Sequence, residues 1–144
     1  MKTPEILSVI AIVMSSITLT WQIISWRRTG AVVKVTAKLG FVPGLDGNFV
    51  VIEASNSGRT AVTVTGYGLK CPDGGNLIQF DRVPLSAEIP HRLEPGAEAS
   101  WLMPIENVQA VCAERGVRYQ DVVAWVRLGS GGTVMARKRG VGLK

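Results

Sequence analysis

The sequence predicts a mainly β domain that follows a single N-terminal transmembrane helix. Three observations predict this class: an uncharged apolar run near the start, short segments in which apolar and polar residues alternate, and turn residues between those segments. A chain of 144 residues has room for one domain once an anchor is subtracted. We therefore expect an anchor in residues 1–28 and a single β domain in residues 29–144.

The anchor is predicted from the run between Ile6 and Trp26, which contains no Asp, Glu, Lys or Arg. As a helix this run would be about 31 Å long, close to the hydrocarbon thickness of a bilayer. Thr3, as a capping residue, and Pro4 predict where the helix starts. A cleaved signal peptide is the main alternative; it needs a basic start and a small-residue cleavage site, and Trp26-Arg27-Arg28 offers no such site. A buried core helix is disfavoured because little else is helical enough to cover it.

The flanks of this helix predict its interface residues and its orientation. The expected interface residues are Trp21, Trp26, Arg27 and Arg28, because indoles and cations favour the ends of a membrane span. Cations follow the helix more densely than they precede it, since Lys34 and Lys38 lie soon after Arg27 and Arg28. Positive flanks tend to stay cytoplasmic, so we expect a single-pass protein of the cell membrane whose β domain is cytoplasmic. An extracytoplasmic domain is the alternative.

The rest of the chain reads as short strands and one helix. Glycine, proline and asparagine clusters separate the segments, and Gly66 and Gly68 predict a bulge inside the third strand. Residues 81–96 carry three prolines and are expected to be irregular or edge-like. The expected strands are 33–39, 50–55, 61–69, 77–80, 97–103, 122–128 and 133–139, with a helix over 104–115.

About seven strands and one short helix predict an immunoglobulin-like β-sandwich. A small barrel is the competing all-β fold. The antibody-type Cys–Trp–Cys framework is absent because Cys112 falls on the predicted helix. Alternating strand directions place the 43–48 turn, the 71–76 turn and the helix at one end of the domain. The 56–59 and 129–132 turns should lie at the other end, next to the anchor.

Three segments resemble a group of uncharacterised bacterial and phage proteins. They are Val51–Val64, the Leu93-Glu-Pro-Gly string and the final hairpin. Proteins of this group pair a short N-terminal anchor with an immunoglobulin-like domain. The resemblance implies the same fold and anchoring for this chain, and it brings no catalytic or binding residue with it.

No motif predicts catalysis, a metal or a cofactor. The Gly129–Gly132 segment resembles a serine-nucleophile loop, but a hairpin turn explains it, and the single histidine, His91, falls in a predicted loop. Cys71 and Cys112 lack metal-ligand spacing; they should be free thiols in the cytoplasm, or could be bridged outside it. We therefore expect a protein that is not an enzyme.

Partner binding is the expected role. The net charge of +5 falls on residues 27–144, with a basic tail at residues 137–139 and 144, but sparse aromatics do not favour nucleic acid. Trp125 alternates with core positions and is expected to face outward, where either a partner or another part of the chain could cover it. The candidate contacts with a partner protein are Asp73, Glu106, Arg115 and Trp125.

These features favour a membrane-tethered, non-enzymatic interaction module. An accessory subunit and a phage-type exclusion or regulatory protein both fit that description. The alternative is a structural component of a larger envelope or virion assembly. In that case small residues such as Ser15, Ser16 and Thr18 would let the helix pack against others, including helices of further copies of this chain.

Overall fold

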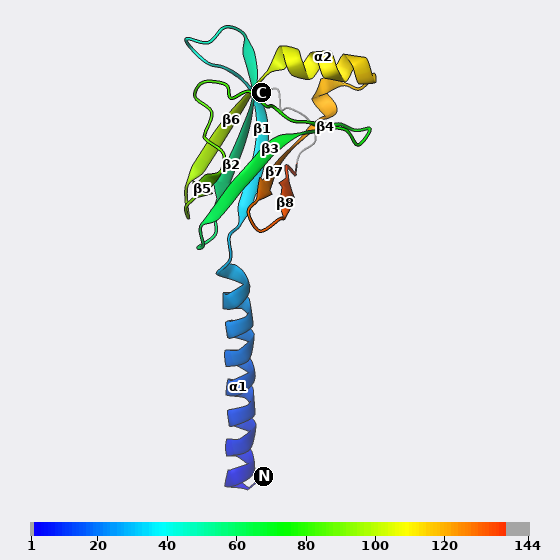
Figure 1. Ribbon diagram of the computed structural model, residues 1–144. Helices are drawn as coiled ribbons and strands as arrows, with labels where there is room; N and C mark the ends of the chain where they lie inside the picture. Colours follow the sequence, from blue (N-terminus) through cyan, green and yellow to red (C-terminus); the bar gives the residue numbers. More distant parts are fainter. Residues whose placement is uncertain (1, 138–144) are drawn as a thin grey trace. The chain divides into compact units, whose positions relative to one another are not determined.

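Figure 1 shows the computed structural model of the protein, in which residues 2–137 are described. The chain divides into two compact units, Met1–Gly30 and Ala31–Lys144. The first unit is a long helix and the second is a β domain. Each is described by itself below.

Helix α1 (Thr3–Arg28) carries apolar side chains on all of its sides. It is long and apolar enough either to cross a membrane or to act as a signal sequence. Five of its hydroxyl side chains are bonded within the helix, each donating to the carbonyl four residues earlier at 2.8–2.9 Å. These belong to Ser8, Ser15, Ser16, Thr18 and Thr20. Such internal bonding is what a hydrocarbon surrounding requires of polar groups.

The start of α1 differs from the prediction. The residue that precedes the first turn is Lys2, so Thr3 is already helical and does not cap the helix. The Lys2 backbone N–H donates instead to the Glu5 carboxylate at 3.2 Å. A carboxylate in the first turn is also favoured by the helix dipole.

The β domain consists of two antiparallel sheets, one short helix and a 3₁₀ turn. One sheet has three strands in the order β1-β2-β6, and the other has five, in the order β4-β3-β7-β8 with β5 also paired to β3. The strands are β1 (Val33–Phe41), β2 (Asn48–Asn56), β3 (Val62–Lys70), β4 (Asn76–Leu77), β5 (His91–Leu93), β6 (Glu98–Pro104), β7 (Val123–Leu128) and β8 (Thr133–Met135); the helices are α2 (Ile105–Arg115) and η1 (Tyr119–Asp121).

The two sheets share one core. Alternate residues of each sheet are buried in it, such as Ile52 and Trp101 from the first sheet and Leu69 and Val126 from the second. The Trp101 ring stacks on Tyr67 with ring centroids 5.4 Å apart, which joins the sheets at their centre. Alternation of apolar and polar residues therefore predicted the long strands correctly, because each long strand buries one face.

Most predicted elements are present, and three differ. The bulge in the third strand is confirmed, since the β3–β7 register shifts between Val64 and Gly66. The strand expected at 77–80 is only the two residues of β4, and β5 lies in the segment expected to be irregular. β8 ends at Met135 rather than at residue 139, and residues 138–139 and 144 of the predicted basic tail lie outside the described residues.

The turns of the domain gather at two ends, as predicted. At the entry end, where the chain arrives from α1, Val33 pairs with Asn56 and the Gly129 N–H donates to the Thr63 carbonyl at 2.7 Å. At the far end the 42–47 loop, the 71–75 turn and α2 lie together (Figure 1). The Asp73–Arg115 ion pair joins that turn to that helix.

Asn56 organises the entry end. Its side chain is 1% exposed and uses all four of its hydrogen-bonding positions. The amide oxygen accepts from the backbone N–H groups of Val32 and Gly58, and the amide nitrogen donates to the carbonyls of Thr60 and Leu93. One side chain therefore holds the start of the domain, the turn after β2 and strand β5 together.

The segment between β4 and β5 covers the free edge of β6. The Leu102 N–H donates to the Ser86 hydroxyl and the Ala87 N–H donates to the Ser100 carbonyl, both at 3.0 Å. Covering an edge strand in this way protects its backbone groups from pairing with another chain. The same segment forms one wall of the surface described next.

Candidate functional surface

Trp125 lies on the outer side of the five-stranded sheet. Its neighbours Ala124 and Val126 are buried in the core, so Trp125 faces away from it. It pairs with Gly68 on β3, where an added Cβ would lie 2.7 Å from the indole Cζ2 atom. Gly68 therefore lets the indole ring lie flat across β3.

The sequence left open whether a partner or another part of the chain covers Trp125, and in the structure the chain itself covers it. The side chain faces outward as predicted, yet it is only 6% exposed, because neighbouring segments of the chain close over it. Strand alternation predicts the side of a residue but not the depth to which its neighbours cover it. The sequence feature that could have predicted this covering is the Gly66-Tyr67-Gly68 string, which lies in the strand that pairs with Trp125.

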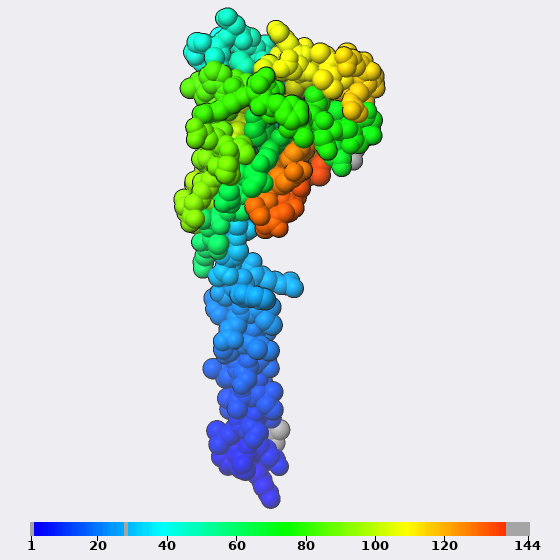
Figure 2. Space-filling model, viewed as in Figure 1, coloured from blue at the N-terminus to red at the C-terminus, as the bar shows by residue number. Residues whose placement is uncertain are grey.

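Two hollows border Trp125 and Arg127, and together we call them the Trp125 groove. The larger, of about 420 Å³, is walled by Tyr67, Ile78, Phe80 and Ile89 among others. The smaller, of about 280 Å³, includes Lys70, Thr133 and Met135. In Figure 2 the green surface, from β3 and the segment after β4, borders the orange surface of β7 and β8.

The groove has exposed apolar walls. Phe80 is 93% exposed and Ile78 is 49% exposed, although both are large apolar side chains. Their neighbours Ile89 and Met135 are also exposed. Scattered exposed apolar residues are ordinary, but several around one concave surface are typical of binding sites.

The charged residues that line the groove are all basic: Lys70, Arg82 and Arg127. Arg82 forms an ion pair with Glu88 at 2.9 Å. The Arg127 guanidinium lies 5.6 Å from the centroid of the Trp125 ring, a cation–π distance. Among the described residues, Lys70 and Arg127 have no carboxylate partner within ion-pair distance.

Two of the other candidate contacts bind each other at the far end. A guanidinium nitrogen of Arg115 lies 3.0 Å from a carboxylate oxygen of Asp73. The Gly75 backbone N–H also donates to Asp73, and this bond followed by Arg115 holds the pKa of Asp73 below its usual value. Glu106 is exposed in the first turn of α2. Asp73, Glu106 and Arg115 therefore share the far end and are separate from the Trp125 groove.

Cys71 and Cys112 also meet at the far end. Both are free and buried, and burial is the largest cause that raises the pKa of each thiol. A side-chain hydrogen bond between the two thiols also affects both pKa values. The structure therefore brings the two cysteines together, at the end of the domain where the 71–76 turn and the helix were predicted to lie.

The residues predicted for the membrane interface lie at the end of α1. Trp21 and Trp26 are 72% and 80% exposed on that helix. Arg27 follows them, and the side chain of Arg28 lies outside the described part of the structure. α1 thus presents two indoles near the end that leads into the β domain.

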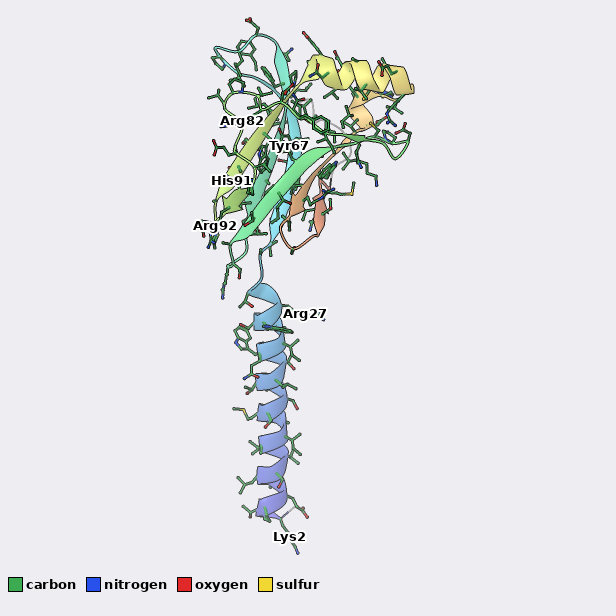
Figure 3. The ribbon with its side chains drawn as sticks, viewed as in Figure 1. Lys2, Arg27, Tyr67, Arg82, His91 and Arg92 are labelled. Atoms are coloured by element: carbon green, nitrogen blue, oxygen red, sulfur yellow. The ribbon has the colours of Figure 1, made fainter. Side chains whose placement is uncertain are left out.

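His91 differs from its prediction as a loop residue. It starts β5, is half-buried and lies edge-on to Trp101, with ring centroids 6.4 Å apart. Figure 3 shows Arg82, His91 and Arg92 following one another along one side of the β domain. Within residues 2–137, no group of three or more His, Cys, Asp and Glu side chains could hold a metal ion.

No protein-family model matches this chain, and no curated protein matches it.

Proposed function

We propose that this protein is a membrane-tethered, non-enzymatic interaction module, in which α1 spans the membrane and the β domain binds another protein. The observation that carries the proposal is the Trp125 groove, with its exposed apolar walls, in a chain whose first helix is apolar on all sides. An accessory subunit and an exclusion or regulatory protein both use a domain held at the membrane in this way.

The domain belongs, in this proposal, to the immunoglobulin-like sandwiches. The strand order supports it, because β1-β2-β6 facing β4-β3-β7-β8 corresponds to strands A-B-E facing C′-C-F-G of that fold. Helix α2 then occupies the connection between strands E and F. Binding sites on such sandwiches lie on their loops or sheet faces, and the Trp125 groove is on the C′-C-F-G face.

The domain is proposed to lie on the cytoplasmic side. Arg27 ends the apolar run and Lys34 and Lys38 follow it, whereas Lys2 and Glu5 lie at its start. Cations beside a span favour the cytoplasm. In this compartment Cys71 and Cys112 would stay reduced.

A photocrosslinker tests the proposal. Benzoylphenylalanine in place of Phe80 in the full-length chain should crosslink to one protein in host membranes, and Ile78→Asp should abolish that adduct. The matched control is the same crosslinker in place of Phe41, which is 69% exposed but does not line the groove. Equal crosslinking from the two positions, or no adduct from Phe80, would overturn the proposal.

The far end is a second contact region in this proposal, because it is the end opposite the chain's entry. Charge reversals at Asp73, Glu106 and Arg115 are expected to weaken the Phe80 adduct more than reversal at Arg59, which lies in an entry-end turn. An adduct that survives all three reversals would limit contact to the groove.

A structural role in an envelope or virion assembly is the second candidate. One observation favours it: the small side chains of Ser16 and Thr20 lie beside Trp21 on one side of α1, against which another helix could pack. The oligomeric state in detergent, with and without the first 28 residues, separates the two roles. Oligomers that require α1 favour assembly, and a monomer in both cases favours the interaction module.

A further inference from the structure

The charge of the Trp125 groove restricts what can bind there. Its three charged lining residues are Lys70, Arg82 and Arg127, and no described acidic residue lines either hollow. Only Arg82 has a carboxylate partner among the described residues. An acidic ligand is therefore attracted by two uncompensated cations, and a basic one is repelled.

The Arg127 cation lies over the buried indole. Its guanidinium is 5.6 Å from the centroid of the Trp125 ring and supplies donors alone. The Trp125 Nε1–H has no hydrogen-bond acceptor among the described residues, but it is itself buried and does not reach the surface of the groove. The charge that a ligand meets there is therefore that of the cations.

The apolar walls and the concave shape favour a peptide over a membrane or a nucleic acid. A bilayer is flat and would meet the convex parts of the domain before the floor of a hollow. Nucleic acid needs stacking aromatics along a basic stripe, whereas Trp125 is covered and Phe80 is the one highly exposed aromatic of the groove. An extended peptide can place an apolar side chain between Ile78 and Phe80 and a carboxylate on Arg127.

We propose that the Trp125 groove binds an acidic peptide segment of a partner protein, in which carboxylates alternate with large apolar side chains. Arg127 and Lys70 bind the carboxylates, and Ile78 and Phe80 contact the apolar side chains. This inference rests on the proposed function and adds the chemistry of the partner to it.

The test selects peptides without knowledge of the partner. The full chain in phosphatidylcholine nanodiscs is panned against a phage-displayed library of random peptides about ten residues long, enough to cross a sheet of this width. Empty nanodiscs remove background binders. The selected peptides should be rich in Asp and Glu combined with Leu, Ile, Phe or Trp. A synthetic representative should lose about tenfold or more in affinity on Arg127→Glu, Lys70→Glu or Phe80→Ser.

Matched controls are Arg59→Glu and Phe41→Ser, which change an exposed cation and an exposed aromatic outside the groove and should leave the affinity unchanged. Lys70→Glu keeps the test valid if Arg127→Glu disturbs the Trp125 ring, since Lys70 makes no cation–π contact with it.

Selected peptides without acidic enrichment, no selected peptide at all, or equal losses in groove and control variants would each overturn the inference. Arg127-dependent capture of phosphatidylglycerol vesicles without peptide binding would also overturn it, and would assign the groove to anionic lipid. The crosslinker at position 80 distinguishes failure of this inference from failure of the proposed function. A crosslink that persists when Arg127→Glu is added would overturn the acidic peptide alone. The absence of a crosslink when no further residue is changed would overturn the proposed function.

Discussion

Replacement of Asn56 by alanine should destabilise the β domain far more than its small size suggests. The substitution removes four hydrogen bonds, of 2.8–3.3 Å, to the backbone of Val32, Gly58, Thr60 and Leu93. A hydrogen bond in a protein contributes about 0.5–1.5 kcal/mol net, and a group left buried without a partner costs more. Three of these bonds are partly buried, and the bond to the carbonyl of Leu93 is fully buried. We therefore expect a loss of about 3 kcal/mol in the free energy of unfolding.

The assay is guanidinium denaturation of residues 29–144, followed by far-UV circular dichroism. A loss of this size should also lower the melting temperature by about 12 °C for a domain of this length. The matched control is Asn48→Ala at the other end of β2, where the side chain is exposed, and its effect should stay within about 0.5 kcal/mol. If the two variants unfold at the same denaturant concentration, Asn56 does not organise the entry end.

Asn56→Asp tests the donor group of the Asn56 side chain separately from its acceptor group, because it replaces only the amide nitrogen. The carboxylate keeps an acceptor for Val32 and Gly58 but turns its second oxygen toward the carbonyls of Thr60 and Leu93. Burial beside carbonyls favours the protonated form, so the pKa of this aspartate should rise in the folded state. Its destabilisation relative to wild type should then be greatest at neutral pH and should shrink as the pH falls through the raised pKa.

Three other predictions concern the whole domain. Residues 29–144 should fold alone as a soluble, strand-rich domain, and a far-UV spectrum dominated by helix or coil would contradict this. In intact cells Ser130→Cys should react with a membrane-impermeant thiol reagent only after lysis, and labelling before lysis would place the domain outside. Because burial raises the pKa values of Cys71 and Cys112, their alkylation at neutral pH should be slow in the folded chain and faster at higher pH. Equal rates at neutral pH with and without denaturant would show that the two thiols are not buried.

The sequence alone predicted those elements of the fold in which apolar residues recur at a regular spacing. β1, β2 and α2 each present one apolar face, so alternation or helical spacing located them to within a few residues. β5 could not be found this way, because its three residues lie among prolines and become a strand only by pairing with β3. Such pairing is a tertiary effect, on which local sequence carries little information.

The candidate surface was predicted less completely than the fold. Asp73 and Arg115 were expected as separate partner contacts, and their mutual ion pair needs two elements that lie 42 positions apart in the chain. Trp125 faces outward as predicted, but the groove beside it depends on Ile78 and Phe80, which lie in a segment expected to be a strand. Alternation cannot show that this segment leaves the sheet to wall the groove.

The pairing of β1 has a mechanical consequence for a tethered domain. β1 begins five residues after α1 and pairs with β2 along its full length, from Val33 with Asn56 to Phe41 with Asn48. If lipid holds the helix while a partner pulls on the groove, the force enters at Val33 and runs along the strand. Antiparallel hydrogen bonds are perpendicular to that pull, so the whole ladder resists it in shear and no single bond can yield first. β1, the strand that follows α1, would thus carry the load in a domain that is held through that helix.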